Sequence, residues 1–237
     1  VIFIIAIAFG VSRNFGSEGT PNTALDVKDI SANAAGPDAV IAALEERTRK
    51  DPMDVEAWQL LGWSYFENGR YLDSANAYGK ATQLEPGRAV YWSSLGESLV
   101  MADESNPMPK AAKAAFDKAI ILDPKDPRSR YFLAVSKDLD GDHKGAINDW
   151  LALLKDTPKD APWESDLIRT IEQVGKIHKI DVTESLASTQ KKRTGDLSGI
   201  LKSIAAAPIP GPSKADMAQA AKLPPGIDFI QGNLVQA

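Results

Sequence analysis

Two histidines and the absence of cysteine limit the chemistry that this chain of 237 residues can perform. His143 follows an acidic run and His178 lies further along the chain, and neither has a second ligand at the spacing of a metal motif such as HExxH. No Ser stands in a nucleophile motif. Without cysteine the chain is neither a cysteine enzyme nor a carrier of covalently attached c-type haem. We therefore predict surface histidines, no catalytic residue, no metal site and no cofactor.

Carboxylates are the other side chains that could bind a metal ion or take part in catalysis, and they occur in short clusters. Residues 138–142 read DLDGD, which is similar to part of a calcium-binding loop. The residues that follow lack the Glu at the twelfth position that such a loop requires. Acidic pairs at residues 45–46 and 103–104 fall on expected helix exteriors and turns. We predict that these carboxylates, including the DLDGD run, are solvated, and that the chain is not an enzyme.

The charge balance indicates which partners to expect. The chain has 27 Lys and Arg against 32 Asp and Glu, a net charge of −5 and a pI near 5.2. Binding to nucleic acid needs clustered Lys and Arg that contact phosphates, so we expect no nucleic-acid partner. Hydrophobic residues make up 43% and charged residues 25% of the chain, which is typical of a folded protein. Protein partners are the expectation.

An internal repeat predicts the elements that position these residues. Prolines at Pro52, Pro86, Pro124 and Pro158 are separated by 34, 38 and 34 residues. The tetratricopeptide repeat (TPR) has a period of 34 residues and the pattern W-x2-L-G-x2-Y in its first helix. Residues 58–65 match this pattern completely. The chain is thus predicted to contain stacked pairs of helices.

The second and third units are variants of the first. The second has Trp92, Leu95 and Gly96, followed by an insertion within residues 103–109 that explains the longer interval. The third is degenerate but keeps Trp150 near its end. A pair of antiparallel helices can bury its apolar faces only against its neighbours, so stacked units share one core. We predict an all-α TPR superhelix of about three helix pairs plus flanking helices, behind an N-terminal membrane segment.

Small residues are predicted to let the two helices of each pair approach closely: Gly62, Gly96 and Ala134. Large aromatic residues are predicted to fill the space between successive pairs: Tyr78, Phe116 and Trp150. A lone helix is expected over residues 38–50, and a second one over residues 163–179 would cap the open end of the array.

The chain divides into four segments by composition. Residues 1–12 begin with an unbroken apolar run that is shorter than the roughly 20 residues needed to cross a bilayer. We predict an incomplete transmembrane anchor; the end of a signal sequence and a buried helix are the alternatives. Residues 13–37 are predicted to be a flexible linker and residues 38–180 the TPR domain. Residues 181–237 are predicted to be a mobile linker and tail that contains a short helix.

The concave side of such an array is a groove lined by the first helix of each unit. By repeat position, the side chains of the groove face should be Glu56, Gln59, Trp63, Phe66, Ser93, Glu97, Val100, Arg128, Tyr131 and Val135. An amphipathic helix would lay its apolar side on the aromatic residues while its basic residues meet Glu56 and Glu97. Packing of this face against the linker or against another copy of the chain is the alternative. An acidic array should steer a basic ligand, and salt should weaken the binding.

The third unit carries a more specific pattern than a generic repeat. It reads Arg-x-x-Leu-Ala, Gly-Asp, Ala-Ile, Trp-x-x-Leu-Leu and then Asp-Ala-Pro-Trp. The matching residues are Arg130, Tyr131, Phe132, Leu133, Ala134, Gly141, Asp142, Ala146, Ile147, Trp150, Leu153, Leu154, Asp160, Ala161, Pro162 and Trp163. Over about residues 40–177 the chain resembles the TPR domain of the CcmI/CycH proteins of bacterial cytochrome c maturation.

The resemblance implies a function and a location. It implies a non-enzymatic, membrane-anchored chaperone of the bacterial inner membrane, with its TPR domain in the periplasm. Such a protein holds unfolded apocytochrome c, largely through the client's C-terminal helix, and works with other cytochrome c maturation membrane proteins that ligate haem. Haem then belongs to the client. A generic periplasmic TPR scaffold for envelope complexes is the alternative, and an enzyme whose site lies beyond this chain is a third hypothesis.

Overall fold

The computed structural model describes residues 36–159 and 161–191, and this part of the chain is helical with no strand. Its helices in chain order are α3 (Pro37–Lys50), α4 (Val55–Glu67), α5 (Tyr71–Leu84), α6 (Ala89–Ala102), α7 (Lys110–Leu122), α8 (Pro127–Leu139), α9 (His143–Asp156) and α10 (Glu164–His178). Residues 183–191 are also helical. The predicted all-α class is confirmed for the described residues.

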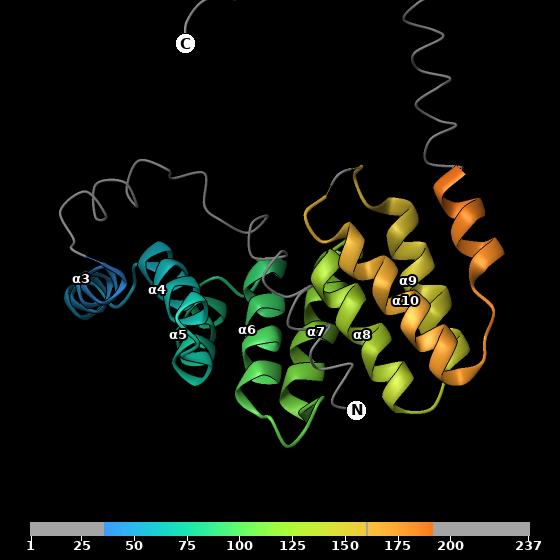
Figure 1. The fold of residues 1–237 in the computed structure, drawn as a ribbon. Coiled ribbons are helices and arrows are strands. Elements are labelled where there is room, and N and C mark those ends of the chain that lie inside the picture. The colour runs from blue at the N-terminus through green and yellow to red at the C-terminus, as the bar shows by residue number, and fades with distance from the viewer. Residues whose placement is uncertain (1–35, 160, 192–237) are drawn as a thin grey trace, which may run out of the picture. The chain divides into compact units, whose positions relative to one another are not determined.

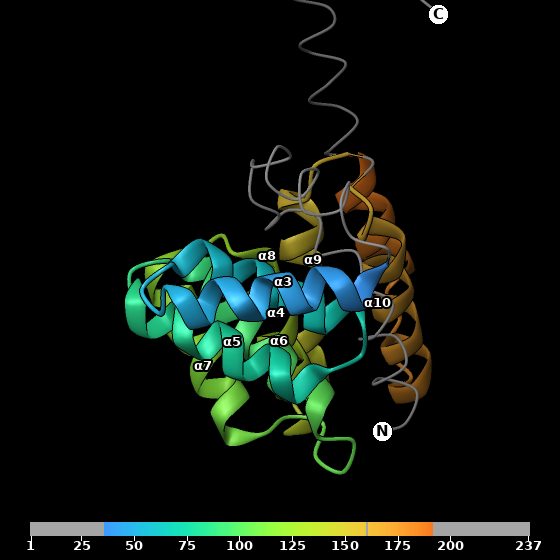
Figure 2. The same cartoon turned by 90° about the vertical axis from the view of Figure 1, so that its left-hand side faces the viewer.

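The helices stack in chain order as pairs. α4 packs with α5, α6 with α7, and α8 with α9, and each pair also contacts the next one. Figure 1 shows α3 beside α4 at one end of this array and α10 against α9 at the other. Figure 2 looks at the array from the α3 end, with α3 in front of the later helices. Three helix pairs with a flanking helix on each side match the predicted TPR arrangement.

Aspartates begin three of the helices. Asp54, Asp126 and Asp142 are the N-cap residues of α4, α8 and α9, and each side chain accepts a hydrogen bond from a backbone N–H in the first turn. The N···O distances are 2.9, 2.7 and 2.9 Å. These bonds satisfy backbone donors that have no partner within the helix. The caps help to define the turns from which successive helices start.

Glycine permits close packing inside two of the pairs. A Cβ atom added to Gly62 on α4 would lie 3.0 Å from the ring of Tyr78 on α5. One added to Gly96 on α6 would lie 2.7 Å from the ring of Phe116 on α7. The predicted close approach is therefore confirmed at both glycines. The rings of Tyr78 and Phe116 thus pack on the glycine of their own pair, and Phe116 also reaches the next pair, as predicted, where it stacks on Phe132.

Two groups of buried apolar residues form the core. The smaller group joins α3, α4 and α5 around Leu44 and Leu60. The larger runs from α6 past α10, and it includes the stacked rings of Phe116 and Phe132, whose centroids are 4.8 Å apart. Leu186 also belongs to this core and is 7% exposed. The packed region therefore extends beyond the domain boundary predicted at residue 180.

The predicted membrane anchor at residues 1–12 lies outside the described residues. The same holds for most of the predicted linker, residues 13–37, and for residue 160 and residues 192–237. Across the helices that the structure describes, none combines the length and the apolar character needed to cross a membrane.

Candidate functional site

The first helices of the three pairs carry all ten residues of the predicted groove face. They are Glu56, Gln59, Trp63 and Phe66 on α4, Ser93, Glu97 and Val100 on α6, and Arg128, Tyr131 and Val135 on α8. Three side chains, all on α4, are half-exposed: Glu56, Trp63 and Phe66. The other seven are buried. The face is therefore not uniform, and its accessible part lies at α4.

Two of the buried side chains bond to the helix after next, which lies beside them in the array. The Tyr91 hydroxyl on α6 donates to Gln59 Oε1 on α4 at 3.2 Å. Tyr131 Oη on α8 and Thr170 Oγ1 on α10 share a hydrogen bond of 3.3 Å. Gln59 and Tyr131 occupy equivalent repeat positions, so both side chains link neighbouring first helices. Tyr131, which was predicted to contact a ligand, is 0% exposed and packs within the array.

Burial also controls the chemistry of Tyr131. Loss of solvent around the phenolate raises the pKa of Tyr131 well above its ordinary value, and the hydrogen bond to Thr170 acts in the opposite direction. A charged oxygen is disfavoured in an environment that excludes water. Tyr131 is therefore a neutral side chain that contributes packing and a hydrogen bond, rather than an acid or base.

A buried ion pair lies between α6 and α8. Arg128 Nε is 2.7 Å from Glu97 Oε2, and the two side chains are 6% and 4% exposed. Arg128 Nη1 also donates to Ser94 Oγ at 2.8 Å and to Ser93 Oγ at 3.3 Å. A buried charge is tolerated when it is paired and hydrogen-bonded. The two charges pair with each other, and the hydroxyl groups of Ser93 and Ser94 accept hydrogen bonds from Arg128. Glu97 and Arg128 were predicted to face a ligand, and the structure places them in a link between two pairs of helices.

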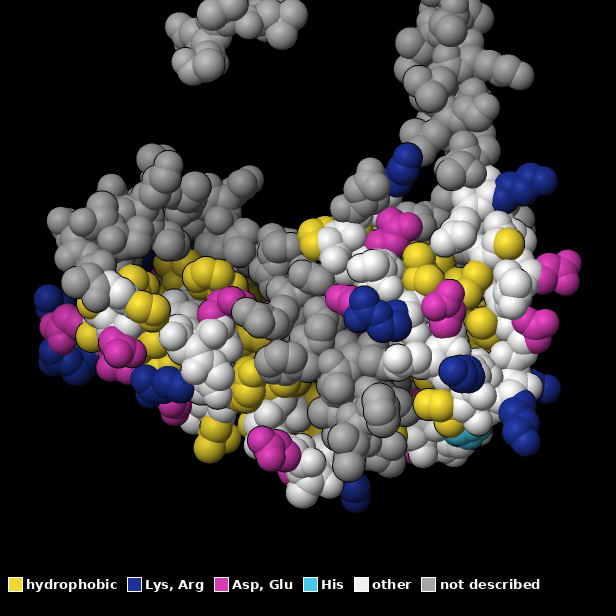
Figure 3. Space-filling model, in the orientation of Figure 1, with side chains coloured by type: hydrophobic (Ala, Val, Ile, Leu, Met, Phe, Trp, Pro, Cys, Tyr) yellow, Lys and Arg dark blue, Asp and Glu magenta, His cyan; other side chains and the backbone are white. Residues whose placement is uncertain are grey.

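The accessible part of the groove face combines aromatic and acidic groups. The rings of Phe66 and Tyr71 meet edge to face, with centroids 5.2 Å apart. Glu56 Oε2 accepts a hydrogen bond of 3.3 Å from Arg47 on α3. Figure 3 shows hydrophobic side chains among charged ones at the end of the array formed by α3, α4 and α5. This end can offer apolar contact next to charged groups of both signs.

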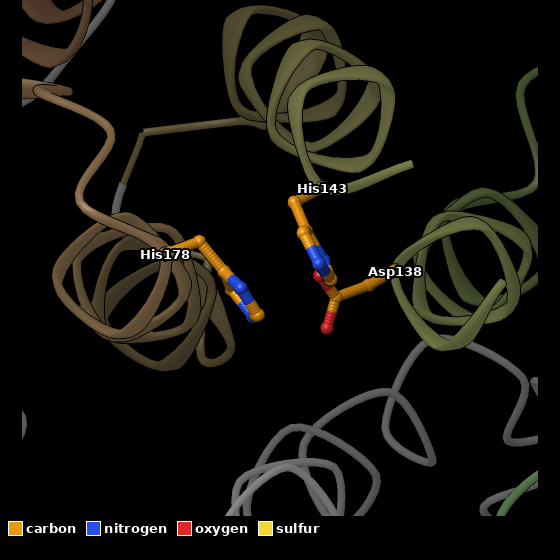
Figure 4. Close-up of side chains that lie close together, drawn as sticks. All are labelled: Asp138, His143 and His178. Atoms are coloured by element: carbon orange, nitrogen blue, oxygen red, sulfur yellow. The ribbon is translucent and has the colours of Figure 1, made fainter. Parts of the chain in front are cut away.

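A second group of side chains, which sequence reasoning missed, meets at the other end of the array. Asp138 lies near the end of α8, His143 is the first residue of α9, and His178 is the last residue of α10. His143 Nδ1 is 2.7 Å from Asp138 Oδ1, and the two imidazole rings stack with centroids 3.4 Å apart. Figure 4 shows the three side chains pointing toward one another.

This cluster corrects two expectations. The DLDGD run was predicted to be solvated, but Asp138 is only 3% exposed because it faces α9 and α10. The histidines were predicted to be separate surface residues, but both are half-buried and in contact. The stacking of α10 on the third pair brings His178 to His143. The only signal in the sequence was that the capping helix ends in a histidine.

Comparison with known proteins gives the family. Residues 32–163, more than half of the chain, match the family described as the cytochrome c-type biogenesis protein H TPR domain. The crystal structure of MamA has a similar fold, with a TM-score of 0.54 over 75% of this chain and 96% of that one. Its sequence identity is 22%, so the likeness supports the TPR fold alone.

Two curated relatives are similar over most of the chain's length. The cytochrome c-type biogenesis protein CycH of Rhizobium meliloti is 32% identical over 154 residues, which is 63% of this chain and 39% of that protein. CycH of Bradyrhizobium diazoefficiens is 28% identical over 172 residues, 71% of this chain and 46% of that protein. The chain thus spans less than half the length of both relatives. The resemblance found in the third repeat is confirmed, and the chain belongs to the family of the cytochrome c-type biogenesis protein H TPR domain.

Proposed function

We propose that this chain acts in cytochrome c maturation as a non-enzymatic holder of unfolded apocytochrome c. The family supports the pathway, because both curated relatives are cytochrome c-type biogenesis proteins. The fold supports the mode of action, because a stack of helix pairs presents an extended surface to another polypeptide. The ligand in this proposal is the C-terminal helix of the client.

The observation that carries the proposal is the half-exposed aromatic pair on α4. Glu56, Trp63 and Phe66 recur at helical spacing on the same side of this helix, and all three side chains are partly accessible. An amphipathic helix binds such a surface through apolar residues three or four positions apart. We place the apolar contact of the client on Trp63 and Phe66 and its basic residues near the acidic groups of α3 and α4. Glu97 and Tyr131 are buried, and they hold neighbouring helix pairs together rather than contact the client.

We also propose the setting of this activity. The relatives are bacterial proteins of cytochrome c biogenesis, and the apolar run at residues 1–11 has the composition of a membrane segment. An anchor in the inner membrane would hold the array in the periplasm, close to the membrane proteins that ligate haem. The chain would then present its client to these proteins.

A binding titration with three ligands tests the function. The full chain is titrated with a haem-free c-type cytochrome, with its holo form and with a peptide of its isolated C-terminal helix. We expect binding to the haem-free protein and to the peptide but not to the holo form, and weaker binding as salt screens the acidic array. Equal binding to the holo form, or binding to none of the three, would contradict the proposal and favour a general scaffold.

A pair of variants tests the surface. Trp63→Ala should weaken binding of the peptide by about tenfold or more, because aromatic anchors dominate the energetics of such contacts. Leu72→Ala is the matched control: Leu72 is an apolar residue of α5 that is 65% exposed and lies outside the groove face. This control should bind as the parent does. If the two variants bind equally well while far-UV circular dichroism shows both to be folded, Trp63 is not the anchor.

A further inference from the structure

Asp138 and His143 are in contact before any ligand arrives, and the ring of His178 lies beside them. Asp138 lies 3% exposed at the end of α8, where a carboxylate requires a partner to offset lost hydration. His143 Nδ1 supplies that partner at 2.7 Å. Asp142 caps α9, and Gly141 in the preceding turn has a φ of +90°, a conformation that glycine adopts easily. The tight turn therefore brings the imidazole of His143 to the carboxylate.

His178 is held in place by the end of α10. The next residue, Lys179, has the left-handed φ of 56° that often ends a helix. The backbone N–H of Ile180 then donates to the carbonyl of Gly175 at 2.8 Å. A Cβ at Gly175 would lie 2.8 Å from the Ile180 carbonyl oxygen, so this close turn needs glycine. The imidazole of His178 thus projects from a well-defined helix end onto His143.

We propose that Asp138, His143 and His178 form a binding site for a divalent transition-metal ion such as Zn²⁺. One ligand atom from each residue lies within 4.8 Å of the others. Nitrogen and oxygen ligands of tetrahedral zinc, at about 2.0–2.2 Å from the ion, stand about 3.3 Å apart. The ring of His178, which stacks on that of His143, would turn out of the stack so that one of its nitrogens points at the ion. Two imidazoles and one carboxylate are ligands that zinc, nickel and copper share.

The ion would replace the hydrogen between two of these groups. In the structure His143 Nδ1 and Asp138 Oδ1 are at hydrogen-bonding distance. When the ion enters between them, the neutral imidazole carries its hydrogen on Nε2 and Nδ1 becomes a ligand. His178 provides the second nitrogen, and the fourth position of a tetrahedral ion stays open to water or to a side chain of a partner.

The electrostatic field at the cluster of Asp138, His143 and His178 favours a cation. Asp138 carries a negative charge, and it lies near the C-terminal end of α8, where the aligned peptide dipoles make the end of a helix partly negative. His178 lies at the C-terminal end of α10, which has the same polarity. The N-terminus of α9, where His143 lies, opposes them in part. A bound ion would tie the capping helix α10 to the third pair and stabilise the array by mass action.

The composition of the chain makes the site easy to test. His143 and His178 are its two histidines, and it has no cysteine. A metal ion bound through imidazole nitrogen therefore reports on this cluster alone, provided that the protein carries no polyhistidine tag. The full chain is titrated with Zn²⁺ by calorimetry against a competing chelator. We expect one ion per chain.

Three variants separate a metal site from a structural contact. His178→Gln leaves the contact between Asp138 and His143 intact, and we expect it to weaken zinc binding at least about tenfold, as losses of metal-site interactions do. Asp138→Asn should weaken binding as well. Asp140→Asn removes the same charge from an exposed position in the same turn, so it should bind zinc as the parent does.

Nuclear magnetic resonance of the parent protein gives a test that needs no variant. With ¹⁵N-labelled imidazoles, addition of one equivalent of Zn²⁺ should shift the ring signals of both histidines. Shifts at one histidine or at neither would overturn the proposal, as would zinc affinity that His178→Gln leaves unchanged. Loss of binding in Asp140→Asn equal to that in Asp138→Asn would show an adventitious ion on acidic residues, and would also overturn it.

Discussion

At the scale of single residues, Tyr65 links the stability of the array to pH. Its hydroxyl donates to Glu45 Oε1 at 2.6 Å, and the residue is 8% exposed. Burial, together with the neighbouring carboxylate, raises the pKa of Tyr65 to about 12. The folded state therefore keeps a proton that the unfolded chain releases above about pH 10. The contribution is complete below pH 10 and is lost as the pH rises toward 12.

We expect the free energy of unfolding to fall over this interval by up to about 1.4 kcal/mol per pH unit from Tyr65 alone. Urea unfolding between pH 8 and pH 11 measures it. Other buried tyrosines, such as Tyr78, contribute in the same direction, since burial also raises the pKa of Tyr78. Tyr65→Phe isolates one group: the stability difference between the parent and this variant should shrink above pH 10. Parallel profiles would contradict the assignment.

Substitution of Arg128 tests the contribution of its buried ion pair with Glu97 to stability. Arg128→Ala leaves the carboxylate of Glu97 buried without its cation, and breaking a buried pair in this way typically costs about 3–5 kcal/mol. Chemical denaturation should show a loss of that size. Lys113→Ala is the control, because Lys113 and Asp117 form an exposed pair that contributes little. A loss no larger than that of the control would contradict a stabilising role for this buried ion pair.

At the scale of helices, contact within a pair depends on the lack of a side chain at Gly96. Because a Cβ there would lie 2.7 Å from Phe116, Gly96→Ala must push α6 and α7 apart or displace the ring. We expect destabilisation of about 1–3 kcal/mol, the range for overpacking. Gly79→Ala is the matched control, since a Cβ at Gly79 meets nothing within 4 Å.

The control should change stability in the opposite direction. Gly79 lies inside α5, where alanine is favoured over glycine by roughly 0.5–1 kcal/mol. Thermal unfolding followed by circular dichroism at 222 nm compares the two variants. If Gly96→Ala is as stable as Gly79→Ala, then the helices of the second pair do not need glycine to pack.

At the scale of the whole array, each pair depends on its neighbours. Leu167 and Ile171 of α10 are 0% exposed in the core that α8 and α9 share. A chain that ends at residue 159 lacks these residues, so it should expose the apolar side of the third pair. In a stack of nearest-neighbour contacts, the effect should fade with distance along the array.

Hydrogen exchange measures this loss helix by helix. In the truncated chain we expect faster exchange of backbone amides in α8 and α9, and little change in α4 and α5, which belong to the smaller core. The full chain is the reference. An equal increase in all helices would show that the array unfolds as one unit.

Local patterns determined much of this protein. The interval between the prolines and the pattern at residues 58–65 predicted helix pairs, because helical periodicity and chain-breaking residues act over a few neighbours. The close approach at Gly62 and Gly96 followed from the same repeat positions. The unusual residue pattern of the third unit identified the family. None of these features depends on contacts between residues that are far apart in the sequence.

Only the tertiary structure decided how the charged and titratable groups meet. Sequence position correctly placed Glu97 and Arg128 on first helices, but it did not show that they pair with each other across two units. It also did not show that α10 brings His178 to His143. Such contacts depend on the angles and spacings between stacked helices. Those are set jointly by all the side chains at each interface, so residues far apart in the sequence meet only in the assembled fold.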